Sequence, residues 1–260
     1  MVMWTRLLRL VLFVLVAVGT VSDLVAQKKQ VSAPSSKTEA SKSTAPSTTA
    51  VSTTPSSSDQ VLKFLSPQEK QILDEINFAR AKPSEYLKLL LEFRANYKGN
   101  QIHFPDGRIL VTNEGVAALD DAINFLRSVQ PAPPLEIREG MIQAARIHAT
   151  DLVTNNRSGH QGSDGSKPQD RFSRYGTWNN TVGENIVYDS RNSRSDVILM
   201  LIDDGTANRG HRKNLFKGDF GVIGIATGRR PDASALSVIT FAGGFNEKGT
   251  VKNVIVPQKY

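Results

Sequence analysis

The sequence contains no cysteine among its 260 residues. Disulfide bonds and catalysis by a cysteine nucleophile are therefore excluded. Small domains that fold in oxidising surroundings often depend on disulfides for stability, so this chain has to rely on a hydrophobic core. The roughly 200 residues that follow residue 60 are enough to form one.

Several catalytic and nucleotide-binding patterns are absent as well. No His-Glu-x-x-His sequence marks a zinc-peptidase helix, and no Gly-x-Ser-x-Gly sequence marks a nucleophile elbow. The glycine-rich segment Gly162–Ser166 lacks the Lys-Ser/Thr pair that follows a phosphate-binding loop, so it predicts a turn.

The chain lacks concentrated positive charge, although its formal net charge is +7. Its basic residues are dispersed, and aromatic residues are not interleaved with them. Because nucleic-acid binding needs a basic stripe or patch, no nucleic-acid partner is expected. A weak attraction to anionic surfaces is compatible with this charge.

Residues 1–26 have the features of a secretory signal peptide. Arg6 and Arg9 give a positive start, Leu10–Val18 is a short apolar run, and Leu24–Ala26 is a candidate cleavage site. The run is shorter than the roughly 20 residues that span a bilayer; an uncleaved anchor is the alternative. We expect a secreted or extracytoplasmic protein, and the lack of cysteine fits a bacterial cell envelope better than an animal secretion.

Residues 27–60 are rich in Ser, Thr, Ala, Pro and Lys, with few scattered aliphatic residues. Such a segment cannot bury enough apolar surface to offset the entropy lost on ordering. We predict a disordered linker that spaces the domain from a membrane or wall and associates it with the cell envelope. A tail without a role is the alternative. The folded domain then comprises residues 61–260.

Helical periodicity dominates the first part of this domain. Ser66–Glu69 combines a capping box with a proline at the first helical position. Apolar residues at helical spacing also follow Pro83 and Thr112, with Ser84 and Thr112 as candidate caps. A further helical stripe covers residues 137–152. The polar segment 99–110, with its turn at 105–107, predicts a connecting loop.

The second part of the domain predicts shorter elements. Thr181–Tyr188 reads as a strand with Val182, Glu184, Ile186 and Tyr188 on one face. Residues 196–202 predict a short helix capped by Ser193 or Ser195. Residues 220–227 and 236–242 predict an antiparallel hairpin, and helices followed by a late hairpin favour an α+β fold.

A set of short motifs runs through residues 69–246 in a fixed order. They are Leu73–Asn77 with Ala79-Arg80, then Ala144-Ala145 with His148-Ala149, Gly159-His160 with Asp164-Gly165, Gly183–Ile186, and Gly210–Arg212 with Asn214. This set resembles the CAP superfamily of cysteine-rich secretory proteins, antigen 5 and pathogenesis-related 1, and is most similar to its bacterial secreted branch.

The resemblance implies a three-layer α-β-α sandwich with an antiparallel central sheet. It also implies a cleft with two histidines and two acidic residues, which correspond here to His160, Glu184 and His211. The second acid departs from the family pattern, because Asp203 or Asp204 stands where glutamate is expected. In the family this cleft can hold a divalent metal such as zinc, here through His160 and His211, and some members bind sterols or lipids.

The residues alone leave the chemistry of this cleft open. Imidazole and carboxylate groups suit zinc, but they can equally hydrogen-bond to one another. Glu184 interrupts an apolar strand, where it either pairs with a histidine or has its pKa raised by burial. The alternative is that it holds a loop by accepting backbone N–H bonds. His148 lies on an apolar helical stripe, which predicts a core histidine rather than a ligand. Arg212 is expected to form an ion pair with Asp203 or Asp204, and binding of an anionic ligand is the alternative.

Three functions fit these features. The first is a non-enzymatic secreted module whose cleft, lined by His160, Glu184, Asp203 or Asp204 and His211, binds a small ligand such as a lipid or sterol. The second is a metal-dependent hydrolase or peptidase with Glu184 as general base. The third is a structural or adhesive envelope protein.

Overall fold

The computed structural model describes residues 57–190, 192–230 and 234–249. The predicted signal peptide, most of the predicted linker and the end of the chain lie outside these ranges. The described helices are α1 (Ser57–Leu62), α2 (Pro67–Ala81), α3 (Pro83–Phe93), α4 (Val116–Ser128), α5 (Glu139–Thr154), α6 (Pro168–Tyr175), α7 (Ser193–Ile202) and α8 (Gly210–Phe216), with a 3₁₀ turn η1 (Arg94–Asn96). The strands are β1 (Tyr97–Lys98), β2 (Gln101–His103), β3 (Ile109–Val111), β4 (Glu136–Ile137), β5 (Gly176–Tyr188), β6 (Val222–Arg229) and β7 (Ala235–Glu247).

The central sheet has the strand order β4-β6-β7-β5, so β5 lies at one edge. The predicted hairpin is confirmed, because β6 and β7 pair antiparallel, and β5 pairs antiparallel with the other side of β7. The two-residue strand β4 adds a short parallel pairing to β6. A second, small sheet has the order β1-β2-β3.

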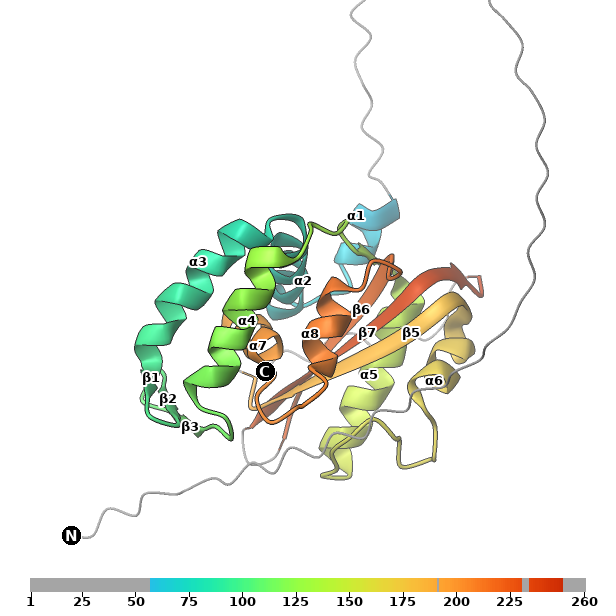
Figure 1. Cartoon of the computed structure of the whole chain (residues 1–260). Coiled ribbons are helices and arrows are strands. Elements are labelled where there is room, and N and C mark those ends of the chain that lie inside the picture. The colour runs from blue at the N-terminus through green and yellow to red at the C-terminus, as the bar shows by residue number, and fades with distance from the viewer. Residues whose placement is uncertain (1–56, 191, 231–233, 250–260) are drawn as a thin grey trace, which may run out of the picture.

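Helices cover both faces of the central sheet, which is the three-layer α-β-α arrangement (Figure 1). Neighbouring residues of β7 show the division. Ile239 and Phe241 belong to the core cluster that includes α2, α3, α4 and α7. Val238 packs with α5, and Ala242 packs with α5 and α6. Because successive strand residues point to opposite faces, one strand supplies both cores. Within the described ranges, no helix has the length and apolar character needed to cross a bilayer.

The predicted capping box at the start of α2 is present and joins three elements. Ser66 Oγ accepts a hydrogen bond from the Glu69 amide at 3.2 Å, and Glu69 Oε2 accepts one from the Ser66 amide at 2.7 Å. Glu69 is fully buried and also pairs with Arg146 of α5 at 3.2 Å and accepts the Thr227 amide of β6 at 2.8 Å. The cap therefore ties α2 to the sheet and to α5.

The other predicted caps are wrong. Ser84 lies inside α3, which begins at Pro83 after Lys82. Thr112 donates its hydroxyl to the Asn100 carbonyl instead of capping α4, whose N-cap is Gly115 at φ 61°. The N-cap of α7 is Asn192, not Ser193 or Ser195.

The predicted loop at residues 99–110 is also wrong, because β2 and β3 form a hairpin there. Each strand has three residues, too few for a clear alternation of polar and apolar side chains. Residues 168–175 and 210–216 form α6 and α8, which the sequence reading did not assign as helices.

Gly224 of β6 allows α5 to approach the sheet closely. A Cβ atom at this position would lie 2.1 Å from the Met141 backbone carbon. We predict that Gly224→Ala lowers the free energy of unfolding by about 2 kcal/mol, because α5 must move away from the sheet. Urea denaturation measures this change. Gly218→Ala is the control, since no heavy atom lies within 4 Å of a Cβ there; equal stability of both variants would contradict the close packing.

Candidate functional site

Glu184 lies on β5 and faces the layer formed by α5 and α6. Its neighbours on that face, Val182, Ile186 and Tyr188, pack against residues of α5 or α6. The side chain of Glu184 is only 1% exposed. The strand and its shared face are therefore as the sequence predicted, and they bury a carboxylate among apolar residues.

Both carboxylate oxygens of Glu184 are bonded. The ring Nδ1 of His160 lies 2.9 Å from Oε1, and Arg171 of α6 donates to Oε2 at 2.7 Å. Arg171, itself fully buried, also donates to the His160 carbonyl at 3.2 Å. The arginine therefore neutralises the buried carboxylate and fixes the loop that carries His160.

These contacts keep Glu184 ionised. Burial alone would raise the pKa of this carboxyl group, but the hydrogen bond from His160 and the positive charge of Arg171 outweigh burial and hold the pKa below its ordinary value. Removing one member of such a buried pair leaves an uncompensated charge.

His148 of α5 is fully buried, as a core histidine should be, yet it also touches the site. Its Nε2 donates to the Gly159 carbonyl at 2.9 Å and lies 3.7 Å from Glu184 Oε1. His148 is therefore the predicted core histidine, and it is also a neighbour of the site residue Glu184. An apolar stripe does not reveal that a glutamate approaches from another element. Burial lowers the pKa of His148, even though the nearby Glu184 charge raises it.

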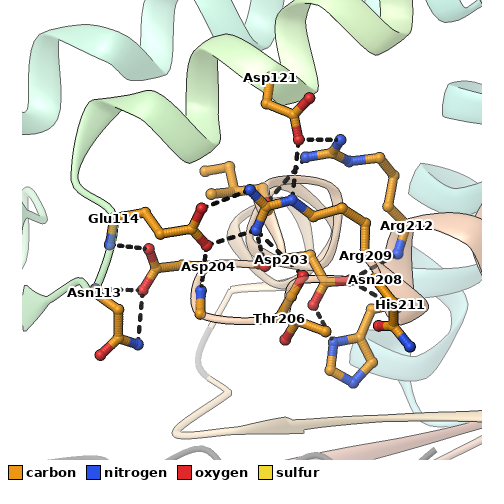
Figure 2. Close-up of polar contacts among 12 residues, drawn as sticks. Asn113, Glu114, Asp121, Asp203, Asp204, Thr206, Asn208, Arg209, His211 and Arg212 are labelled. Carbon is orange, nitrogen blue, oxygen red and sulfur yellow. Dashed lines mark hydrogen bonds and ion pairs between the residues drawn. The ribbon is translucent and has the colours of Figure 1, made fainter.

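Asp203 and His211 form a second histidine–carboxylate pair, on the face of the central sheet opposite to Glu184. Asp203 is the C-cap of α7, and His211 is in the first turn of α8. Asp203 Oδ1 lies 2.8 Å from His211 Nδ1, while Oδ2 accepts the backbone amides of His211 at 2.8 Å and Arg212 at 3.3 Å. One buried carboxylate thus caps α8 and orients the imidazole (Figure 2).

Asp204 points elsewhere. Its carboxylate accepts the backbone amides of Asn113 at 2.6 Å and Glu114 at 2.9 Å, before α4. Of the two candidates it is therefore Asp203 that pairs with His211. The predicted ion pair of Arg212 with Asp203 or Asp204 is wrong. The Arg212 guanidinium pairs with Asp121 at 2.9 Å, and only the backbone amide of Arg212 donates to the Asp203 carboxylate.

The pleat of β5 separates the two pairs. Glu184 faces α5 and α6, whereas the next residue, Asn185, donates to the His211 carbonyl at 3.1 Å and contacts Met200 of α7. The pairs therefore approach this edge strand from opposite faces. Within the described ranges, no three His, Asp or Glu side chains lie close enough together to hold a metal ion.

Both imidazoles have the same orientation relative to their partners. Nδ1 faces a carboxylate, so the neutral ring carries its proton on Nδ1 and leaves Nε2 as a hydrogen-bond acceptor. The side chain of His160 is 33% exposed and that of His211 15%. Each Nε2 can therefore accept a hydrogen bond from a donor that approaches the ring.

A cavity of about 160 Å³ lies beside the second pair. Its apolar lining comes from the β2–β3 hairpin, the end of β5 and α7, and includes Phe104, Leu110, Val111, Val187, Leu199 and Met200. Asp203, Asp204 and His211 provide part of the polar lining; His160 and Glu184 do not line it. Sequence reasoning missed the hairpin wall because it took that segment for a loop.

Comparison with protein families gives one match. Residues 121–242 match the family model CAP, the cysteine-rich secretory protein family, which is the family that the motifs indicated. The match includes α5 and all the candidate site residues.

Among the solved structures that match part of this chain are two bacterial proteins. An outer surface protein of Borrelia burgdorferi is 20% identical with a TM-score of 0.38, covering 51% of this chain and 91% of that one. An extracellular protein of Bacillus anthracis with an SCP domain is 22% identical with a TM-score of 0.34, covering 46% of this chain and only 37% of that one. No curated protein sequence matches the chain.

Glu184→Gln tests the buried ion pair. We predict a loss of about 3 kcal/mol in the free energy of unfolding, because Arg171 stays buried without a counter-charge. Chemical denaturation at neutral pH measures it. Glu136→Gln is the matched control, since Glu136 pairs with Arg138 at 2.7 Å on the surface and should matter little. A loss no larger than the control's would contradict the pairing.

His148→Gln tests the buried histidine, because the glutamine amide retains a donor for the Gly159 carbonyl without a titratable ring. The folded-state pKa of His148 lies below its ordinary value of 6.5, so the unfolded chain binds the proton more readily as the pH falls. Wild-type stability relative to the variant should therefore be full above pH 6.5 and decrease as the pH falls below it. Urea denaturation from pH 7.5 to pH 5 would refute this if the difference stayed constant.

Proposed function

We propose that this protein is an extracytoplasmic binding module of the CAP family that holds a small amphiphilic ligand in the cavity beside His211. The ligand is an apolar chain with a hydroxyl group, such as a long-chain alcohol or the hydroxyl end of a sterol. The single observation that carries this proposal is a cavity with a mainly aliphatic and aromatic lining, whose polar part includes one oriented imidazole.

The size and lining of the cavity favour an apolar group. Pockets for small molecules are mostly apolar with a few well-placed polar groups. A volume of about 160 Å³ is close to that of the roughly 150 Å³ apolar cavity that accepts benzene. It therefore suits one end of an aliphatic molecule rather than a whole lipid. Val111, 43% exposed on β3, lies in its lining.

The orientation of His211 favours a hydroxyl group. Since Nδ1 is directed at Asp203, the neutral ring offers Nε2 as an acceptor, and a hydroxyl is a donor that fits it. The Asp203 carboxylate is fully buried and is used by His211 and the start of α8. It fixes the ring and is not available to the ligand.

A metal ion has weaker support. A carboxylate on Nδ1 is typical of histidines that bind metal through Nε2, and both pairs have this arrangement. A zinc site, however, uses at least three protein ligands, and the described residues do not bring three together. Zinc binding by His160 and His211 stays a prediction, and elemental analysis of the purified protein tests it.

The bonding of Glu184 favours binding over hydrolysis at the first pair. A general base must accept a proton from a nearby reacting group, but both oxygens of Glu184 are engaged by His160 and Arg171, and its pKa is lowered. Glu184 is therefore better suited to hold His160 than to activate water.

The extracytoplasmic location is supported by the signal-peptide pattern of residues 1–26 and by the match of residues 121–242 to a secretory protein family. A cysteine-free chain also folds independently of the redox state of its surroundings.

Calorimetric titration with 1-decanol and with its methyl ether tests the proposal. The alcohol can donate to Nε2, and the ether cannot. We predict that the protein binds the alcohol more tightly by about fivefold, one hydrogen bond's worth. His211→Asn should abolish this preference, because the asparagine amide still reaches Asp203 but offers no acceptor in the place of Nε2.

Two tryptophan variants locate the site. Val111→Trp should block the cavity and weaken the binding of both compounds, whereas Leu91→Trp adds the same bulk at another exposed apolar position, 46% exposed and outside the cavity lining. Failure of the protein to bind either compound, or equal binding by both tryptophan variants, would sink the proposal.

A further inference from the structure

The loop between α7 and α8, residues 203–209, has an unusual backbone at both ends. Asp203 has φ 51° and ψ 48°, and Arg209 has φ 51° and ψ 49°. Residues other than glycine adopt this left-handed conformation rarely, and they keep it only where surrounding contacts hold it. Both residues adjoin the proposed ligand site, because Asp203 pairs with the His211 ring and Arg209 is the N-cap of α8, the helix that carries His211.

Arg209 makes the contacts that hold this conformation. Its guanidinium forms a bidentate pair with Glu114, at 2.6 Å to Oε1 and 2.7 Å to Oε2, and reaches Asp121 of α4 at 3.0 Å. The same group donates to the Asp203 carbonyl at 2.8 Å. The Arg209 side chain is 16% exposed, whereas those of Glu114 and Asp121 are 36% and 51% exposed. Solvent and salt therefore screen these charges in part, and the contacts depend on the number and geometry of their hydrogen bonds.

Reciprocal bonds join the loop to the segment before α4. Asp204 accepts the amides of Asn113 and Glu114, and Glu114 Oε1 accepts the Gly205 amide at 2.8 Å (Figure 2). Asn113, Asp203 and Asp204 all line the cavity. The ion pairs of Arg209 therefore fasten two walls of the cavity to each other.

We propose that Arg209 is a positioning residue for the ligand site, which holds the Asp203 carboxylate in place against the His211 ring by clamping loop 203–209 onto α4. The clamp acts in sequence. Glu114 and Asp121 fix the guanidinium, the guanidinium fixes the Asp203 backbone, and the Asp203 carboxylate fixes the ring and amide of His211. The effect of this clamp on the His211 ring does not depend on the proposed function, whereas its effect on ligand binding rests on it.

The hydrogen-bonding requirement is specific to arginine. A lysine retains the charge but cannot bond Glu114 through two parallel donors while also reaching Asp121 and the Asp203 carbonyl. The hydrogen bond from Arg209 also holds the pKa of Glu114 below its ordinary value, as expected for a carboxylate that is paired in the folded protein.

The test compares Arg209→Gln, Arg209→Lys and Glu114→Gln in the full chain. Nitrogen-15 NMR of the His211 ring reports whether Nδ1 keeps its proton, and hydrogen exchange reports whether Asp203 still protects the amides of His211 and Arg212. Arg138→Gln is the matched control, because it removes an ion pair to Glu136 on β4 and leaves the loop alone.

We expect Arg209→Gln to mix the two ring tautomers and to speed the exchange of the His211 amide by about tenfold or more. Arg209→Lys and Glu114→Gln should show the same changes to a smaller degree, and Arg138→Gln should show neither. If Arg209→Gln does not fold, the other two variants decide the matter. Unchanged ring signals and exchange rates in the folded variants, with only a lower melting temperature, would overturn the positioning role.

Titration with 1-decanol separates this inference from the proposed function. If the wild type binds the alcohol, Arg209→Gln should lose the preference for the alcohol over its methyl ether. If the wild type binds neither compound while the His211 signals still depend on Arg209, the proposed function fails and the positioning role stands. A preserved preference together with unchanged His211 signals would overturn the inference alone.

Discussion

The alternation of side chains along the edge strand β5 is the constraint on which the rest of the site depends. Glu184 faces α5 and α6, and Asn185 faces α7 and α8. The strand thereby holds a histidine–carboxylate pair on one face and the carbonyl of the second histidine on the other. Because β5 pairs with β7 along nearly its whole length, neither side chain can change face without shifting the register of the sheet.

The two pairs are supported by different physics. The Glu184 carboxylate of the first pair is stabilised by a buried ion pair with Arg171. No arginine side chain among the described residues pairs with the Asp203 carboxylate. It is stabilised by the ring of His211 and by the amides at the start of α8, where the helix dipole favours a negative charge. The first pair stabilises a loop, and the second borders a cavity. This difference is the reason why we propose the ligand site at His211 rather than at His160.

Much of the architecture could be predicted from local patterns. The capping box at Ser66, the strand that contains Glu184 and the late hairpin each depend on neighbouring residues, and each is present. The ordered set of short motifs indicated the three-layer fold through its resemblance to the CAP superfamily. Disulfide bonds cannot stabilise this fold here, because the chain has no cysteine.

The failures share a physical cause. The partners of Arg212 and Asp204, the contact of His148 with Glu184 and the hairpin wall of the cavity all depend on residues distant in the chain. Periodicity reports which face of an element is buried, but not which group from another element meets it. The choice between Asp203 and Asp204 likewise depended on the left-handed turn at the end of α7, which no local pattern announced.

The tautomeric state of His160 and His211 in the wild-type protein tests the account most directly. Nitrogen-15 NMR at neutral pH, with each ring assigned by substitution, distinguishes a proton on Nδ1 from one on Nε2. The account predicts that both neutral rings carry the proton on Nδ1, directed at Glu184 and Asp203, with Nε2 unprotonated. A proton on Nε2, or rapid averaging between the two nitrogens in either ring, would contradict it.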